Sequence, residues 1–199
     1  MAVTIFKDAS YNLQGLISKI DHGDIGLPDI QRPFVWSNAK VRDLFDSMYK
    51  GFPVGYLLLW ATGAETNTKN IGDTEKQSLP SLLIVDGQQR LTSLYAVLTG
   101  HAVVRSDYTR GKIRIAFRPV DERFEVTDAA IEKNPEFVSD ISEIYKGNFL
   151  SFVNGYLKQL EIYRGEEVEE EEKNRLAENL DRLRDLQNYP FQAIELDKS

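Results

Sequence analysis

Two Gln-Arg pairs are the residues of this chain whose types and spacing point most directly to chemistry. One pair is Gln31-Arg32 and the other is Gln89-Arg90, 58 positions later. The planar guanidinium group of an arginine matches the oxygens of a phosphate group, and a glutamine can orient an attacking water. Two prolines hold the first pair in an extended segment, and the second lies on a turn. We therefore expect Arg32 and Arg90 to point into one shared polar pocket.

The second pair lies where a strand is expected to turn into a helix. Residues 82–85 form a short apolar run rich in branched side chains, which is typical of a buried strand. Asp86-Gly87 then breaks the run, and apolar residues at helical spacing follow from Leu91 onward. A strand that passes through a glycine turn into a helix aims backbone N–H groups and the positive end of the helix dipole at one point. This predicts an anion site, with Arg90 as a cation beside it.

A purely structural interpretation stands beside this one. Asp86 could cap the helix, with Gln89 three residues on as its capping-box partner. That would explain two of the polar residues but would leave Gln88 and Arg90 crowded onto the same turn. In the same way, the segment around Gln31-Arg32 could be a packed loop whose arginine only stacks on an aromatic ring.

Composition excludes several classes of site. The chain has 199 residues and no cysteine, so disulfides and thiolate metal sites are ruled out. Its two histidines do not have metal-ligand spacing, and we predict no protein metal site. No apolar run approaches the roughly 18 residues of a membrane span, and the first residues lack the apolar core of a signal peptide. A cytoplasmic protein without a membrane partner is predicted.

Charge is unevenly distributed along the chain. The net charge is −7, and residues 161–199 carry 12 acidic and 6 basic side chains, whereas residues 1–160 carry 19 and 18. The near-neutral first part does not have the basic excess that is typical of nucleic-acid binding. The dense acidic run 166–172 suits the first turn of a helix, where the dipole favours carboxylates; the alternative is a metal or partner surface.

Both helices and strands are expected, so the predicted fold class is α+β, with a small mixed β-sheet and helices followed by a mainly helical region. The predicted strands cover residues 53–60, 82–85, 112–118, 124–126 and 191–196. The predicted helices begin after Ser10, after Ser37, near residue 88, after Asp128, at 141 (with a break left open at Gly147-Asn148) and in the acidic run. The P-loop, GxGxxG and GxSxG motifs are absent, which leaves the Gln-Arg pairs as the chemical candidates.

Three segments carry a family resemblance: PDIQRPFVW, PVGYLLLW and IVDGQQRLTSLYAVL. Their order and spacing over about residues 8–100 resemble the domain-of-unknown-function-262 family, which is the N-terminal domain of GmrSD-type, modification-dependent restriction systems. That family is similar in fold to the ParB/sulfiredoxin group, in which a turn at a helix start binds nucleotide phosphate. The resemblance therefore implies a ParB/sulfiredoxin-like fold that binds and hydrolyses a nucleoside triphosphate (NTP), with Mg²⁺ as the accompanying ion, and that controls DNA cleavage by a separate HNH-type nuclease domain.

The resemblance also implies roles for individual residues. Asp86 and Gln89 would be catalytic, because an aspartate can hold Mg²⁺ or accept a proton and a glutamine can position water. The residues expected to bind the nucleotide phosphates are Gln31, Arg32, Gly87, Gln88 and Arg90.

The expected organisation is a nucleotide-binding domain over residues 1–127 and a helical region over residues 128–199. The nuclease domain of full-length members is not in this chain, so we expect a fragment of a longer protein that does not cleave DNA alone. The alternative is a non-catalytic DNA-sensing or protein-interaction module in which the same arginines contact DNA phosphates. The charge balance of residues 1–160 favours nucleotide binding.

Overall fold

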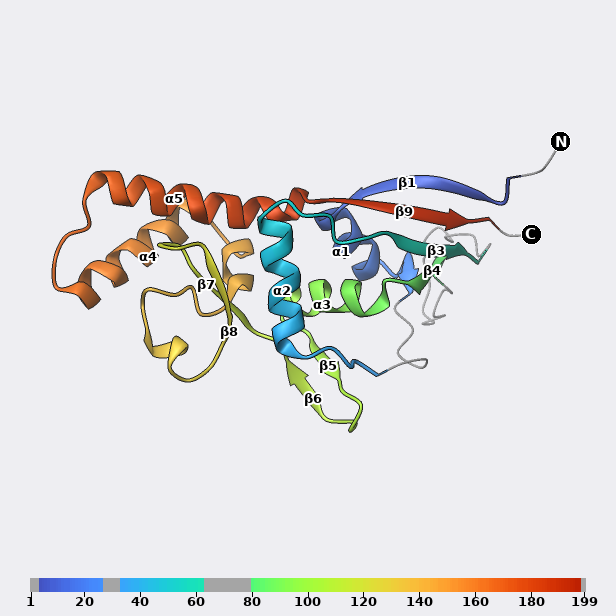
Figure 1. The fold of residues 1–199 in the computed structure, drawn as a ribbon, viewed down its shortest axis with the longest axis horizontal. Helices are drawn as coiled ribbons and strands as arrows, with labels where there is room; N and C mark the ends of the chain where they lie inside the picture. Colours follow the sequence, from blue (N-terminus) through green and yellow to red (C-terminus); the bar gives the residue numbers. More distant parts are fainter. Residues whose placement is uncertain (1–3, 27–32, 63–79, 198–199) are drawn as a thin grey trace, which may run out of the picture. The chain divides into compact units, whose positions relative to one another are not determined.

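The computed structural model describes residues 4–26, 33–62 and 80–197 and shows an α+β protein, as predicted (Figure 1). The chain folds into two compact units, and each is built from segments that lie far apart in the sequence. Unit 1 contains residues 1–33, 55–91 and 187–199, and unit 2 contains residues 34–54 and 92–186. The predicted division after residue 127 follows the chain, whereas these units do not.

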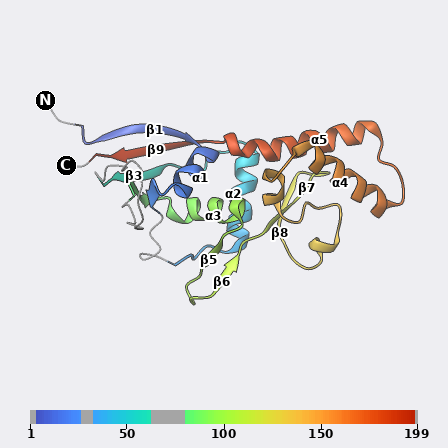
Figure 2. The ribbon, with the colours of Figure 1, turned by 180° about the vertical axis from the view of Figure 1, so that it is seen from behind.

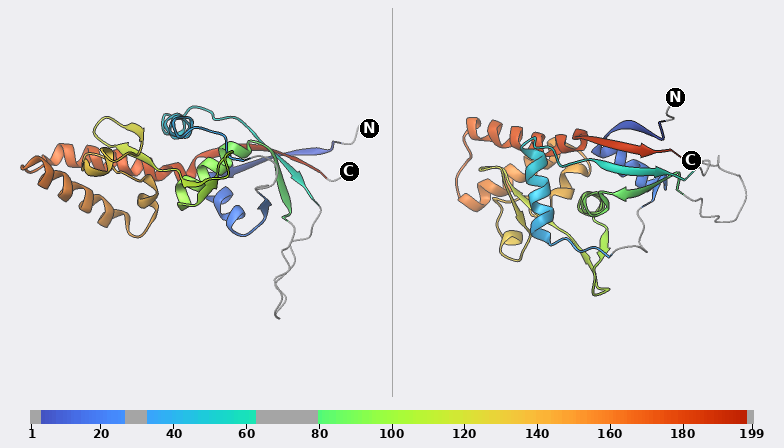
Figure 3. Two further views of the ribbon diagram at one scale, coloured as in Figure 1. Left: turned by 90° about the horizontal axis from the view of Figure 1, so that it is seen from below. Right: turned by 45° about the vertical axis from the view of Figure 1, so that its right-hand side comes forward.

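A five-stranded mixed sheet forms the framework of unit 1, with the strand order β1-β9-β3-β4-β2. The first strand, β1 (Phe6–Asn12), pairs antiparallel with β9 (Pro190–Leu196), which runs parallel to β3 (Leu57–Ala61). On its other edge β3 pairs antiparallel with β4 (Leu82–Asp86), and β4 pairs parallel with the short β2 (Ile25–Gly26). Figure 3 shows β9, β3 and β4 side by side. The predicted strands at 82–85 and 191–196 are confirmed.

Buried and more exposed side chains alternate along β3 and β9 of this sheet. Leu57 and Leu59 of β3 and Phe191 and Ala193 of β9 are buried, whereas residues between them are more exposed. Helix α1 (Leu13–Asp21) contacts β1 and β2. The core of unit 1 is completed by buried residues of the helix and of the neighbouring strands, namely Leu13, Leu16, Ile17, Ile25 and Ile84.

The start of α1 differs from the prediction. Ser10 lies in β1, opposite Gln192, and does not cap a helix. The cap is Asn12, whose side-chain oxygen accepts a hydrogen bond from the Gly15 N–H at 2.8 Å. Asparagine caps helices as well as serine does, so the sheet pairing of the preceding residues decides where the helix begins.

Unit 2 begins with α2 (Asn38–Tyr49), capped as predicted by Ser37, which accepts a hydrogen bond from the Lys40 N–H. Two β-hairpins and two long helices follow, and α4 and α5 contact each other (Figure 2). Their bounds are β5 (Ala102–Val104), β6 (Arg110–Lys112), β7 (Ile115–Arg118), β8 (Arg123–Val126), α4 (Phe149–Arg164) and α5 (Glu170–Asp185). Short 3₁₀ helices cover Ile131–Lys133, Ile141–Tyr145 and Leu186–Asn188.

Two predicted elements of unit 2 are divided in the structure. The strand expected over 112–118 separates into β6 and β7, because each half pairs with a different partner. The pairing of β7 with β8, expected for residues 124–126, is confirmed by the opposite positions of Phe117 and Phe124. The helix expected from residue 141 breaks at Gly147-Asn148, where Gly147 has a φ of 71° and Asn148 caps α4.

The acidic run opens α5, with Glu170, Glu171 and Glu172 in its first turn, as the dipole argument predicted. Glu172 also pairs with Arg164 of α4 at 3.0 Å. Among the residues that the structure describes, no helix is long and apolar enough to cross a membrane.

A buried carboxylate joins β1 to β9. Glu195 is 7% exposed, accepts a hydrogen bond from the Tyr11 hydroxyl and forms an ion pair with Lys7 at 2.8 Å. Burial alone would raise the pKa of Glu195, but the bonds from Lys7 and Tyr11 outweigh it, and the pKa lies below its ordinary value. A carboxylate of lowered pKa contributes stability above its unfolded pKa, and this stability is lost as the pH falls through the folded pKa.

We expect Tyr11→Phe to lower the free energy of unfolding by about 1.5–3 kcal/mol at neutral pH, because it removes a hydrogen bond to a charged group. The difference from the unsubstituted chain should shrink as the pH falls through the lowered pKa of Glu195. Urea unfolding at several pH values measures both effects.

Tyr156→Phe is the matched control, because the Tyr156 hydroxyl donates to a neutral acceptor, the Glu136 carbonyl, at 3.0 Å. Its cost should not depend on carboxylate protonation. An equal pH dependence of the two variants would contradict the role given to Glu195.

Candidate functional site

The DGQQR run forms the predicted strand, turn and helix. The strand β4 ends at Asp86, and α3 (Gln88–Thr99) begins two residues later. The Gly87 carbonyl accepts the first helical hydrogen bond, from the Leu91 N–H at 2.9 Å, so Gly87 occupies the capping position. Asp86 is instead an exposed strand residue opposite Leu58, and the capping interpretation of this aspartate is wrong.

The turn requires glycine at position 87. Gly87 has a φ of 91°, in the region that residues with a side chain rarely adopt. In addition, a Cβ atom at this position would lie 2.6 Å from Cδ2 of Leu57 in the neighbouring strand β3. The close approach of β3 therefore fixes where the first N–H groups of α3 point.

Arg90 is held in the first turn of α3 by the segment that leads into β3. Its Nη1 donates a hydrogen bond to the Tyr56 carbonyl oxygen at 2.9 Å. Its guanidinium also lies against Gly55, where a Cβ atom would be 3.0 Å from Nη2 and φ is 90°. Gly55 and the Tyr56 carbonyl thus pack closely against the Arg90 side chain and orient it.

The charge of Arg90 is partly removed from water. Burial lowers the pKa of Arg90, while the nearby Asp86 carboxylate and Tyr189 act in the opposite direction. An arginine keeps its charge in proteins, so the lowered pKa reflects a cation that has lost part of its hydration. Within the described residues Arg90 is in no ion pair at 4 Å or less. A bound anion would compensate this charge.

Gln89 connects the turn to the first sequence motif. Its Nε2 donates a hydrogen bond to the Pro33 carbonyl oxygen at 3.3 Å. Gln31 and Arg32, which precede this proline, lie outside the described residues. The shared pocket of Arg32 and Arg90 therefore stays a prediction.

Three residues beside Arg90 were not anticipated from the sequence. The strand predicted from residue 53 covers Gly55 and Tyr56, but β3 begins only at Leu57. The glycine could have indicated a close approach, since the PVGYLLLW segment is otherwise apolar. Tyr189 belongs to residues 187–199, the last sequence segment of unit 1, and no local pattern connects it with Arg90.

The described residues include no group of three or more His, Cys, Asp or Glu side chains arranged to hold a metal ion. Magnesium in nucleotide sites is commonly bound by one or two carboxylates and by the phosphates of the substrate. Asp86 beside the turn fits that pattern.

Comparison with known proteins identifies a family for almost the whole chain. The family described as the GmrSD restriction endonuclease N-terminal domain matches residues 13–199. The chain is also similar to the uncharacterized protein MJ0686 of Methanocaldococcus jannaschii, with 35% identity over 97 residues. That similarity covers 42% of this chain and 16% of MJ0686, so it spans a small part of that relative's length.

We expect Gly87→Ala to destabilise the chain more than Gly23→Ala does. Both glycines have a positive φ, which costs other residues about 1–2 kcal/mol. Only Gly87 faces a neighbour, since a Cβ at Gly23 meets nothing within 4 Å. Overpacking should add roughly 1–3 kcal/mol at Gly87. Urea midpoints of the two variants measure the difference, and equal midpoints would show that the contact with Leu57 does not constrain the turn.

Proposed function

We propose that this chain, which belongs to the family of GmrSD restriction endonuclease N-terminal domains, binds an NTP at the turn between β4 and α3. Hydrolysis at this site would regulate a modification-dependent restriction system whose separate nuclease domain cuts DNA. A ParB/sulfiredoxin-like fold is part of the proposal. The family membership supports the restriction context, and the geometry of the turn supports the phosphate site.

The observation that carries the proposal is the state of Arg90. Its guanidinium is half-buried, stays charged, and is oriented by a neutral carbonyl rather than by a carboxylate. It stands in the first turn of a helix, where N–H groups and the dipole favour an anion. A phosphate bound there would accept charge-assisted hydrogen bonds from the arginine and from the backbone.

The remaining residues of the turn fit roles in phosphoryl transfer. Gly87 lets the backbone approach a phosphate without a side chain between them, and Gln88 begins the helix beside it. Gln89, whose amide nitrogen donates a hydrogen bond to the Pro33 carbonyl oxygen, is proposed to orient the attacking water. Asp86 is proposed to hold Mg²⁺ or to accept the proton of that water. Gln31 and Arg32, which lie outside the described residues, are proposed to complete the phosphate contacts.

Arg90→Ala should weaken NTP binding much more than it weakens the fold. A charge-assisted phosphate contact is worth roughly 1.5–3 kcal/mol, which corresponds to about tenfold to a hundredfold in affinity. The loss of one hydrogen bond to the Tyr56 carbonyl should cost only about 0.5–1.5 kcal/mol of stability. Calorimetric titration with NTPs and urea unfolding of the same variant measure the two quantities.

Lys19→Ala in α1 removes one positive charge from the same unit and should leave NTP affinity unchanged. Unchanged affinity of Arg90→Ala, together with a lowered urea midpoint, would make Arg90 a structural residue and refute the proposal. A parallel titration with DNA distinguishes the sites: if the arginine change weakens DNA binding and no NTP binds, the turn contacts DNA phosphates instead.

Asp86→Asn should separate binding from chemistry. The amide has nearly the same shape as the carboxylate but cannot accept a proton or bind Mg²⁺ as strongly. We expect NTP affinity without magnesium to be kept and phosphate release to fall by roughly two to four orders of magnitude, the typical range for loss of a general base. Normal phosphate release from this variant would exclude the catalytic role of Asp86.

A further inference from the structure

The hairpin formed by β5 and β6 is a local basic feature in an acidic chain. Residues 102–112 contain Arg105, Arg110 and Lys112 but only one acidic residue, Asp107, whereas the whole chain has a net charge of −7. The strands pair in register from Ala102 opposite Lys112 to Val104 opposite Arg110. This two-stranded hairpin, residues 102–112, belongs entirely to unit 2.

One of its three cations has a structural role. Nη2 of Arg105 donates a hydrogen bond to the Asn38 side-chain oxygen at 2.6 Å, and its guanidinium lies over the Phe34 ring. The Phe34 N–H also donates to the Val104 carbonyl oxygen at 2.9 Å. These contacts attach the hairpin to the segment that leads into α2 and hold it in place.

The other two cations are presented to solvent. Arg110 and Lys112 are exposed, and their cross-strand neighbours Val104 and Ala102 put them on the same face of the hairpin. They lie two residues apart, which is about 6.7 Å along a strand, so each can reach a separate phosphate. Within the described residues neither side chain is in an ion pair or a hydrogen bond.

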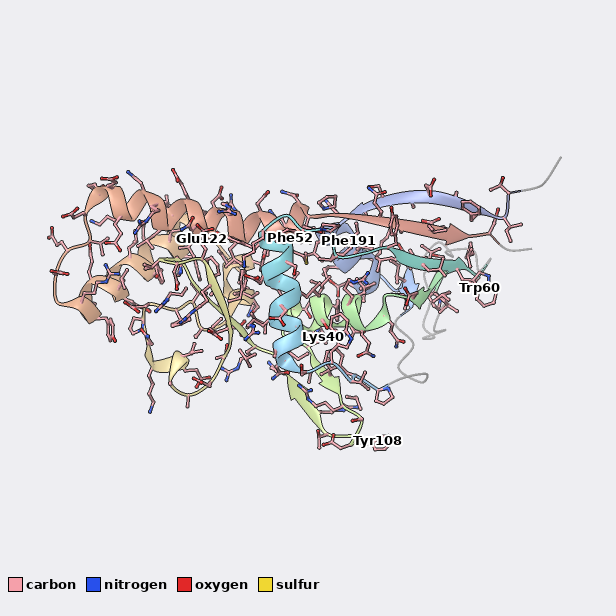
Figure 4. The ribbon with its side chains drawn as sticks, in the orientation of Figure 1. Lys40, Phe52, Trp60, Tyr108, Glu122 and Phe191 are labelled. Atoms are coloured by element: carbon pink, nitrogen blue, oxygen red, sulfur yellow. The ribbon has the colours of Figure 1, made fainter. Side chains whose placement is uncertain are left out.

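The tip of the hairpin adds an exposed aromatic ring. Tyr108 is 85% exposed and has a φ of 63°, at a position where short hairpin loops favour glycine. The turn is shaped by Asp107, whose carboxylate accepts hydrogen bonds from the N–H and hydroxyl of Thr109 at 3.0 and 2.7 Å. The Asp107 carboxylate therefore stabilises the turn. Tyr108 projects at the end of the hairpin (Figure 4).

We infer that this hairpin is a contact site for duplex DNA, independent of the nucleotide site proposed above. A two-stranded ribbon fits the major groove of B-DNA, which is about 12 Å wide. Arginine and lysine side chains are among the groups that contact phosphates at protein–DNA interfaces. Arg110 and Lys112 bind the backbone phosphates, and Tyr108 contacts sugar or base edges in the groove. The family name, which describes a restriction endonuclease, makes DNA the polyanion of matching charge.

The test compares two double variants of the whole chain. Arg110→Ala/Lys112→Ala removes the two hairpin cations, and Lys158→Ala/Arg175→Ala removes two exposed cations from α4 and α5 of the same unit. Binding of a short fluorescent duplex without base modification is measured by anisotropy at several salt concentrations. The hairpin variant should lose at least about tenfold in affinity. Its slope of log affinity against log salt should be smaller by about 2 in magnitude, and the control should match the unsubstituted chain.

Tyr108→Gly tests the tip separately and cannot fail through misfolding of the turn, because glycine favours the observed φ. It should lower affinity while leaving the salt slope unchanged, since the tyrosine carries no charge. Three results would overturn the inference: no binding of the duplex by the unsubstituted chain, equal affinity and slope for the two double variants, or equal competition by poly-glutamate. The last result would identify an acidic protein as the ligand of the hairpin.

Discussion

The geometry of the candidate site depends on the need of β3 for hydrogen-bond partners on both of its edges. Unpaired backbone groups in a buried strand are costly, and β3 satisfies them with β4 on one side and β9 on the other. The position of β3 matters for Arg90, because Tyr56, the residue before this strand, supplies the carbonyl oxygen that orients the guanidinium group. The strand that completes the pairing is formed only from Pro190 onward. The orientation of Arg90 therefore depends on β9 as well as on β4, since both strands hold β3 in place.

Elements with a strong local pattern could be predicted from the sequence. Ser37 caps α2, the apolar run at 82–85 forms a strand, and alternation marks the strand that begins near Phe191. The strand β1 was missed, because Phe6–Asn12 is mostly polar and has no β-branched residue. This segment forms a strand because it pairs with β9, which is far away in the sequence. Alternation shows which side chains share a face, but it does not identify the partner strand.

The same distinction applies to the site. Asp86 to Arg90 could be located because a glycine turn between a strand and a helix has a recognisable pattern. The hydrogen-bond partner of Arg90 could not be predicted, since a backbone carbonyl such as that of Tyr56 can come from any residue type. The predicted strand from residue 53 begins too early. In the structure β3 begins at Leu57, so Gly55 and Tyr56 lie outside the strand, where they contact Arg90.

The choice of a carbonyl partner has an electrostatic consequence for Arg90. A carboxylate at that position would form an ion pair, and the arginine would then attract a phosphate less strongly. A carbonyl orients the guanidinium but carries no net charge, so the positive potential remains. Asp86 is near enough to favour the charged arginine, yet within the described residues it is not joined to it in an ion pair. Partial burial strengthens the attraction for an anion, because less water screens the charge. The fold thus keeps a cation oriented and only partly compensated at the start of a helix, which is the condition that a phosphate site requires.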